Sequence, residues 1–593
     1  MVGCLPERAQ PSVVRPPCLN SARRSRYAKL LPENERELFV RGEAVGEMRH
    51  VCGGARHESR TPEQLEWPMH APIGTLIPWS SIRRAARCPA LTARERYAFG
   101  FLSDPELFRE CARDHPRAKS SVLSVADVKQ IIDNAIFETC DDPIGTGYVF
   151  DVMEYQKRRR RLVHDALSAN VLLPDAPNPK FLTIEEVQRM TLCGSYGATI
   201  DMKAFYYQFP LAEAVRKFFP ILVDGQWLQP CVLPMGFKWA VVIAQAFMRF
   251  VAFTANIPAT ACDIYIDNFL LVGSKSEVDE MFGRIMRVLN DLGVTAGDVE
   301  KGTVVTHRGM SMDFTAKTVA LKASFVEKLR TRMAAANQTW GQIRSIIGMV
   351  VYALMVLDKP LASIFHVFKF WARHVFTSPR KIVTLWQTSR EELNAAINYS
   401  TRNTPLKIKT RPRGRMTIVI TDASLEGGRP RIAGLLVQNG RVRWFAETVR
   451  STATDIAVFE TLAVQKAIVR WSHALQGRSA LLLCDNTVTL SALARGMSCN
   501  YTVNSMVGVM HEFMLRRDIY LGLMYVPSKA NASDPLTREW LWSNEQAVAL
   551  GTAIHWSTLC APGGVDDFLR AQERLFGGSH IPVFRYRGDV VAL

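Results

Sequence analysis

The sequence lacks the features that mark secreted, membrane-spanning and zinc-dependent proteins. Its 12 cysteines are scattered singly between Cys4 and Cys560, and none forms the C-x-x-C pair of a typical zinc site. The first thirty residues hold no unbroken apolar core, and Lys238, Arg249 or Asp358 interrupts each of the longest apolar stretches. We therefore expect reduced thiols and an intracellular protein, cytoplasmic or nuclear, without a membrane span. The basic start of the chain also fits a transit peptide or a nuclear signal.

The chain has fewer acidic than basic residues. Against 73 Lys and Arg stand 56 Asp and Glu, which leaves a net charge of +17 in 593 residues. A polyanionic partner is the simplest explanation, and a set of solvated basic faces is the alternative. The length predicts three or four domains at about 150 residues each.

Composition and periodicity divide the chain into seven segments, with no internal repeat or low-complexity block. We expect a basic, disordered arm at 1–60, a helical extension at 61–144 and mixed strands and helices at 145–315. Helical periods dominate 316–400, a basic linker with Pro and Gly covers 401–416, a β-led α/β pattern covers 417–540, and a C-terminal extension covers 541–593.

A single carboxylate stands out inside the strand-like stretch IYIDNFLLVG, residues 264–273. We expect two short strands hinged at Asp267 and Asn268, since Asp and Asn favour tight turns. Upstream, GATIDMKAFYYQFPL predicts a strand that ends at Asp201 and is followed by a helix. If the strands are neighbours, the two carboxylates converge, and bridging divalent ions would relieve their repulsion. Taken singly, Asp201 is also a plausible helix N-cap and Asp267 a simple turn residue.

Four stretches at these spacings resemble the palm of retroelement reverse transcriptases: DMKAFYYQFPL, LPMGFKWAVVIAQAFMRF, YIDN and VEKGTVVTHRGMSM. The resemblance implies an α/β multidomain protein with a right-hand polymerase fold. Residues 145–315 would form the fingers and an α+β palm, and residues 316–400 the thumb and a connection. Asp201 and Asp267 would be ligands of two Mg²⁺ or Mn²⁺ ions for phosphoryl transfer.

The resemblance assigns nucleotide-binding roles to further residues. Tyr206 matches an aromatic gate against the ribose 2′-OH, and a core aromatic is the alternative. Leu233, Pro234, Met235 and Gly236 match the motif behind the incoming nucleotide, and Gln245 matches a Gln on the following helix. Many relatives have Gln at the place of Met235.

Two basic residues complete the implied nucleotide site. Arg161, at the end of the basic run Lys157–Arg161, matches a finger arginine that neutralises the triphosphate. We interpret the rest of the run as a solvated or backbone-binding face. Lys301 is a candidate proton donor to the leaving pyrophosphate, or else an ordinary exposed lysine. Asn268 departs from the family, which usually has a second acid there, so metal binding should be weaker.

A second carboxylate group lies in residues 417–540. Apolar strands end at Asp422 and Asp485, a helix carries Glu460, and MYVPSKANASDPLTR contains Asp534. Each acid is by itself more often structural. The set resembles the ribonuclease H domain of retroelement polyproteins, which implies an RNase H-like α/β fold and four ligands for two further Mg²⁺ or Mn²⁺ ions. Tyr525 stands where many relatives have a His.

The resemblance as a whole implies an RNA-directed DNA polymerase with ribonuclease H activity. Its partners would be an RNA template, a DNA primer or RNA–DNA hybrid, and dNTPs. The direct join of the two enzymes and the YVPS-x-x-N-x-x-D ending resemble the DIRS-like group, including its VIPER-type members. The alternative is a weakened or domesticated retroelement-derived nucleic-acid-binding protein that retains at most nuclease activity.

Overall fold

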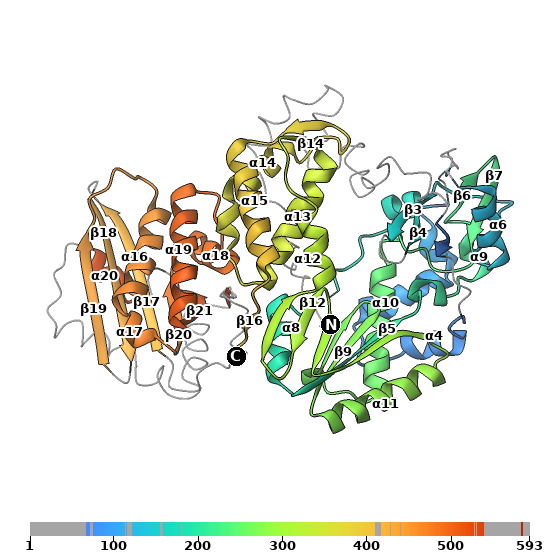
Figure 1. Ribbon diagram of the computed structural model, residues 1–593, viewed down its shortest axis with the longest axis horizontal. Helices are drawn as coiled ribbons and strands as arrows, with labels where there is room; N and C mark the ends of the chain where they lie inside the picture. Colours follow the sequence, from blue (N-terminus) through green and yellow to red (C-terminus); the bar gives the residue numbers. More distant parts are fainter. Residues whose placement is uncertain are drawn as a thin grey trace, which may run out of the picture.

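The computed structural model describes residues 67–70, 75–112, 114, 121, 123–154, 158–179, 181–409, 417–426, 429–438, 441–526, 528, 531–538 and 583–584. The chain is a mixed α/β multidomain protein, with a helical group between two β-containing parts (Figure 1). The expected arm at 1–60 lies outside the described residues, as does all of 541–593 except β22 (Val583–Phe584). No helix within the described ranges has the length and apolar content needed to cross a membrane.

The first carboxylate pair lies on an antiparallel sheet of four strands in the order β10-β5-β9-β8. These are β5 (Tyr196–Met202), β8 (Cys262–Tyr265), β9 (Asn268–Gly273) and β10 (Ala296–Gly302). Apolar side chains from alternate positions of β5 and β9 pack against α10 (Ala240–Thr254) and α11 (Lys275–Asp291). This alternation leaves Asp201 and Asn268 on the opposite face of the sheet.

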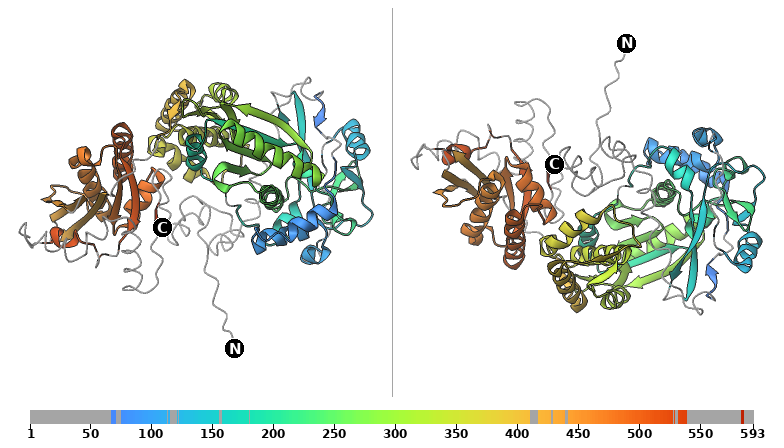
Figure 2. Two further views of the ribbon diagram at one scale, coloured as in Figure 1. Left: turned by 90° about the horizontal axis from the view of Figure 1, so that it is seen from below. Right: turned by 90° about the horizontal axis from the view of Figure 1, so that it is seen from above.

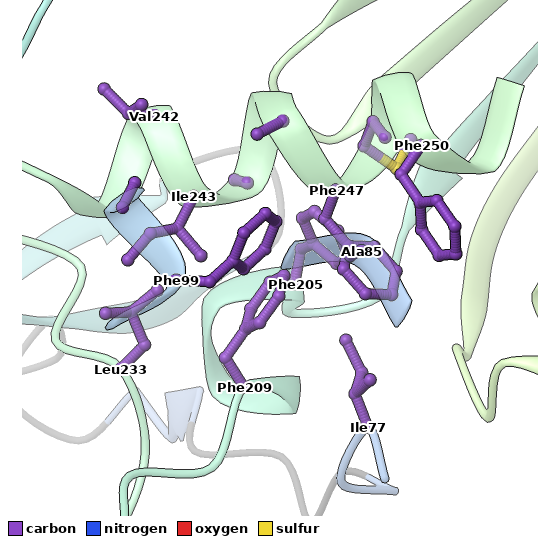
Figure 3. Packing of buried hydrophobic residues seen from close by; sticks show 14 of the residues in the cluster. Ile77, Ala85, Phe99, Phe205, Phe209, Leu233, Val242, Ile243, Phe247 and Phe250 are labelled. Atoms are coloured by element: carbon purple, nitrogen blue, oxygen red, sulfur yellow. The ribbon is translucent and has the colours of Figure 1, made fainter. Parts of the chain in front are cut away.

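The expected helical extension shares a core with this sheet and does not form a separate unit. Its elements are α4 (Trp79–Ala86), α5 (Ala93–Ala98), η2 (Phe99–Leu102) and η3 (Pro105–Phe108). Ile77, Ala85 and Phe99 pack beside Phe205 and Phe247 in one buried cluster (Figure 3). The expected boundary at residue 145 therefore does not coincide with a break in the hydrophobic core.

Two small sheets extend from this core. One is ordered β1-β4-β3, from β1 (Met69–His70), β3 (Tyr148–Glu154) and β4 (Arg159–Asp165); the other is β2-β7-β6, from β2 (Phe137–Thr139), β6 (Ile221–Val223) and β7 (Gln226–Pro230). The short helices of residues 125–261 are α6 (Val125–Asp133), α7 (Leu167–Leu172), α8 (Ile184–Arg189), η5 (Met190–Leu192), η6 (Phe205–Gln208), α9 (Glu213–Arg216) and η7 (Ala259–Ala261).

The basic run differs from the solvated face that was expected. Arg160 is buried, and its guanidinium bonds both oxygens of Asp127, at 2.7 and 2.9 Å, and Asp151 at 3.2 Å. Arg160 therefore joins α6 to the β3–β4 hairpin through a buried ion cluster. The alternation of β4 decides this, because it turns every second residue inward.

A second core lies under the helices of residues 323–402. It is built on the sheet β11-β12-β13-β16 and the pair β14-β15, with strands β11 (Val304–His307), β12 (Met310–Asp313), β13 (Thr318–Leu321), β14 (Asn337–Thr339), β15 (Ile382–Thr384) and β16 (Leu406–Lys407). The helices are α12 (Ala323–Arg330), α13 (Trp340–Val356), η8 (Leu361–Ile364), α14 (Phe365–His374) and α15 (Gln387–Arg402). Of the linker expected at 401–416, the first two residues end α15 and residues 406–407 form β16, while residues 410–416 lie outside the described part.

The C-terminal part is a six-stranded mixed sheet in the order β19-β18-β17-β20-β21-β22. Its other strands are β17 (Thr417–Glu426), β18 (Arg429–Gln438), β19 (Arg441–Thr448), β20 (Ser479–Cys484) and β21 (Tyr520–Tyr525). Helices α16 (Ile456–Arg470), α17 (Ser472–Leu475), α18 (Thr487–Arg495), α19 (Tyr501–Arg517) and α20 (Asp534–Thr537) complete it. Apolar clusters cover both faces of the sheet.

Helix α19 docks this part onto η8, and both views of Figure 2 show the helical group next to it. The amide of Ala362 donates to the carbonyl of Gly496 at 2.9 Å, and Asn504 Nδ2 donates to the carbonyl of Ala362 at 3.1 Å. Lys359 pairs with Glu512, about two helical turns further along α19. Polar contacts with defined partners therefore fix the position of the C-terminal part on its neighbour.

Candidate active sites

Neighbouring strands bring Asp201 and Asp267 to one end of the four-stranded sheet. The antiparallel register places Asp201 opposite Asn268, and Asn268 Nδ2 donates to Asp201 Oδ1 at 2.7 Å. The amide of Met202 donates to the carbonyl oxygen of Asp267 at 2.9 Å. The two acids, 66 residues apart in the chain, thus lie together with an amide between them.

The hairpin that carries Asp267 differs from the expected one. Its turn is Ile266–Asp267, Asn268 is already the first residue of β9, and the left-handed residue is Ile266, with φ +60°. The expected hinge at Asp267 and Asn268 was therefore wrong by one residue. Pairing of Asn268 with both Tyr265 and Asp201 sets this register. A β-branched residue at positive φ is strained, so something must hold the turn.

Gln245 on α10 holds the turn. Its Oε1 accepts a hydrogen bond from the amide of Ile266 at 2.7 Å, and its Nε2 donates to the carbonyl of Ile264 at 3.0 Å. The side chain is buried, so these bonds engage both ends of its amide. The family resemblance implied a nucleotide-binding role for Gln245, whereas in the structure it binds the hairpin backbone.

Arg161 and Tyr206 lie within electrostatic range of Asp267. Burial raises the pKa of Asp267, while the positive charge of Arg161 and a hydrogen bond from Asn268 lower it. Burial raises the pKa of Tyr206, and the Asp267 charge raises it further. Arg161 is half-exposed and also pairs with Glu154 on the adjacent strand. The structure therefore gathers two acids, one guanidinium and one phenol from four chain segments.

Gly236 packs directly against the strand that carries Arg161. Its amide donates to the carbonyl of His164 at 2.9 Å, and a Cβ at this position would collide with that same carbonyl oxygen. A glycine is required here because the loop approaches the strand backbone so closely. Met235, the preceding residue, is half-buried.

Lys301 is not brought to the carboxylate pair. It lies opposite Ala198 in the β10–β5 register, and directly opposed residues point to the same face of a sheet. Ala198 faces α11, and there Lys301 Nζ pairs with Asp279 at 3.0 Å and lies 3.5 Å from the ring centroid of Phe282. Asp201 is three residues from Ala198 and faces the other way. We therefore assign Lys301 no role as proton donor at this site.

The second carboxylate group gathers where the parallel pairing of β17 with β20 ends; the expectation that the strand ends at Asp422 was wrong, because β17 continues to Glu426 through its pairing with β18. Their register pairs Thr421 with Cys484, so the next residues, Asp422 and Asp485, lie side by side. Helix α16 contributes Glu460 from the face that packs on β17, and Asp534 begins α20. Ligand atoms of Glu460, Cys484 and Asp485 all lie within 4.8 Å of one another.

Burial and the charges of neighbouring acids raise the pKa of two members of this group strongly. Burial raises the pKa of Asp422 to about 7, with further increases from the charges of Asp485 and Asp534. Burial raises the pKa of Glu460 to about 9, and Asp422 and Asp485 add to it. Such shifts mean that the four groups lie close enough to disfavour each other's charge.

The donor set fits a hard divalent cation. Four carboxylates converge from separate elements, and Asp485 Oδ1 is buried without a hydrogen-bond partner. Oxygen donors of this kind suit Mg²⁺ or Mn²⁺. A bound cation would reduce the repulsion between the acids and give Asp485 Oδ1 a partner. The first group has only two acids, with Asn268 in place of a third. It therefore offers a divalent ion less negative charge than the second group does.

Several residues of the second group were missed from sequence. Asn531 Nδ2 donates to Asp422 Oδ1 at 3.2 Å, and Thr537 Oγ1 donates to Asp422 Oδ2 at 2.7 Å. Arg538 binds Asp534 through two nitrogens, at 2.9 and 3.1 Å. All three belong to the stretch NASDPLTR, whose other polar residues were a signal that could have been followed.

No family model matches the chain, and no curated protein sequence matches it. Among solved structures, a foamy viral protease-reverse transcriptase in complex with an RNA/DNA hybrid is similar, with TM-score 0.44 and 13% identity over 79% of this chain and 65% of that one. A foamy viral protease-reverse transcriptase in complex with double-stranded DNA gives TM-score 0.42 and 13% identity over 76% of this chain and 98% of that one. Because both scores lie below 0.5, we base the functional proposal on the geometry of the two sites.

Proposed function

We propose that the chain is an RNA-directed DNA polymerase with an attached ribonuclease H. The observation that carries this proposal is the assembly of two separate carboxylate groups, each from chain segments far apart in sequence. Proteins rarely gather acids in this way without a cation to offset the repulsion. The four stretches that resemble a polymerase palm and the Asp-Glu-Asp-Asp set that resembles a nuclease support this chemistry.

Under this proposal the architecture has four functional parts. The β3–β4 hairpin serves as fingers, the β10-β5-β9-β8 sheet as palm, and α12–α15 as thumb and connection. The sheet of residues 417–538 serves as the nuclease domain. The placement within the DIRS-like group, including its VIPER-type members, rests on the sequence resemblance.

In the first site, Asp201 and Asp267 would hold Mg²⁺ or Mn²⁺. Bound there, such ions activate a primer 3′-OH and stabilise the charge on the transferred phosphoryl group. Arg161 offers a guanidinium to the triphosphate of an incoming dNTP. Tyr206 sets its ring against the sugar and excludes a 2′-OH by size, and Met235 and Gly236 form the wall behind the nucleotide.

In the second site, Asp422, Glu460, Asp485 and Asp534 would hold the divalent ions for hydrolysis of the RNA strand of a hybrid. Asn531 and Thr537 orient Asp422 by bonding one oxygen each. The raised pKa of Glu460 keeps this side chain protonated near neutral pH until a cation takes the place of the proton.

The hydrogen bond from Asn268 to Asp201 favours a second candidate function. It stabilises the pair without a cation, so the first site could persist in a chain that has lost polymerase activity. The alternative is then a weakened or domesticated nucleic-acid-binding protein that retains at most nuclease activity.

The deciding experiment measures primer extension and RNA–DNA hybrid cleavage with Mg²⁺ and with Mn²⁺. Asp201→Asn should abolish extension and spare cleavage, and Asp485→Asn should do the reverse. Asp224→Asn, at an exposed turn with φ +47°, is the matched control and should change neither. Absence of extension by the wild-type chain with both ions would reject the polymerase, and absence of cleavage would reject the nuclease.

A further inference from the structure

Arg538 occupies an unusual place beside the second site. Its Nη2 lies 2.9 Å from Asp534 Oδ1 and its Nε lies 3.1 Å from Asp534 Oδ2, so one guanidinium edge engages both carboxylate oxygens. Its Nη1 pairs with Glu426 at the end of β17. In the described part of the chain, no other Lys or Arg forms an ion pair with any of the four acids.

The other three acids are held differently. Asp422 accepts bonds from the neutral donors Asn531 and Thr537, and Glu460 and Asp485 have no cationic partner among the described residues. Thr537 Oγ1 also lies 2.8 Å from the carbonyl oxygen of Asp534, so the two acceptors share its one hydrogen and the α20 turn links Arg538 to the site. The group is therefore asymmetric: Asp485 has an oxygen without a hydrogen-bond partner, and the charge of Asp534 is neutralised by Arg538.

We propose, resting on the nuclease function above, that Arg538 is a built-in counter-cation that competes with a divalent ion for Asp534. Both oxygens of Asp534 accept charge-assisted hydrogen bonds from Arg538, and these bonds must be broken or shared for the ion to bind. The guanidinium charge also repels an approaching dication. Ion binding is then stepwise: the Glu460 and Asp485 side binds first, and the Asp534 side binds more weakly.

The competition predicts in which direction the affinity for Mn²⁺ changes in the Arg538→Gln variant. Loss of the charge removes the competitor, so the weaker of the two binding steps for Mn²⁺ should become about tenfold tighter, a change equal to about 1.4 kcal/mol. Arg538→Lys keeps a positive charge without the planar fork and should fall between wild type and Arg538→Gln. Without divalent ions, Arg538→Gln should melt at a lower temperature than wild type, because the acids lose their counter-ion.

The test titrates Mn²⁺ into the full chain by calorimetry, in an Asp201→Asn background that removes binding at the first site. Arg470→Gln is the matched control, because Arg470 has the same exposed fraction as Arg538, 47%, and pairs with Glu447 away from the acids. Its Mn²⁺ affinities should equal those of the background. Adding Asp534→Asn to Arg538→Gln should abolish the gain in affinity, since the contested carboxylate is then absent.

Unchanged or weaker Mn²⁺ binding by both Arg538 variants would overturn the inference, because Arg538 would then orient Asp534 for the ion. A background chain whose Mn²⁺ binding is unaffected by Asp485→Asn would instead reject the proposed nuclease site. Circular dichroism at the titration temperature verifies that each variant is folded, and Arg538→Lys tests the competition should Arg538→Gln fail to fold.

Discussion

The buried amide of Gln245 should be required to keep Asp267 in place. The Gln245→Met variant fills nearly the same volume but makes neither hydrogen bond to the hairpin. It leaves the amide of Ile266 and the carbonyl of Ile264 without their partner, at about 1–3 kcal/mol each when such groups are buried. Because the hairpin is partly exposed and water can compensate in part, we expect a loss of about 2–4 kcal/mol in the free energy of unfolding.

The strain at Ile266 adds a functional consequence. A β-branched residue at φ +60° costs on the order of 1–3 kcal/mol, so an unclamped turn should relax and move Asp267. Primer extension should fall accordingly. Ile266→Gly in the same chain should restore part of the extension, because glycine holds the left-handed angle without that cost.

The control for this prediction is Gln188→Met. Gln188 is equally buried and donates one hydrogen bond, to the carbonyl of Val356 at 2.7 Å. It should lower stability by about 1–2 kcal/mol and spare extension, after correction for the unfolded fraction. Urea denaturation and steady-state extension kinetics supply the two measurements. If Gln245→Met raises KM for dNTP while stability stays unchanged, Gln245 contacts the nucleotide and the clamp is refuted.

Three further predictions follow from the contacts of single residues. Gly236→Ala should cost about 1–3 kcal/mol by urea denaturation, because its Cβ collides with the His164 carbonyl, whereas Gly283→Ala on α11, with open space around it, should be neutral or stabilising. Asn268→Asp should destabilise the chain without divalent ions, since two acids then face each other, yet increase extension or relax its metal requirement; unchanged kinetics would argue that Asn268 lies outside the metal site. Glu460 and Asp422 bind protons more tightly in the folded than in the unfolded chain, because folding raises the pKa of Asp422 to about 7 and that of Glu460 to about 9. The free energy of unfolding without divalent ions should therefore fall as the pH rises from about 4 toward these two values. Mg²⁺ or Mn²⁺ should offset this loss more at pH 8.5 than at pH 6, and a melting temperature that rises with pH in the metal-free chain would contradict the shifts.

Local patterns identified the acids and the strands that carry them. Asp201 lies near the end of an apolar strand, Asp485 follows another, and both strands lie where their apolar runs predicted. The prediction could go this far because a strand is encoded by neighbouring residues, and a polar side chain at its end is visible in the same stretch.

The direction in which a side chain points, and whether it is buried, could not be predicted in this way. Lys301 lies close to Asp201 in sheet order, yet the β10–β5 register turns it toward α11. Arg160 differs from its basic neighbours only in the parity of its position on β4, which directs it into an ion cluster with Asp127. Long-range pairing decides both outcomes, and no local window contains it.

The sequence by itself determined which acids are present, that they lie on or beside strands and helices, and that the chain carries a net positive charge. Only the tertiary structure decided that the left-handed turn residue is Ile266, that Gln245 holds it, and that Arg538 covers Asp534. The physical reason is that chain-local chemistry sets strand and helix formation, whereas register and packing between distant segments set the direction of each side chain.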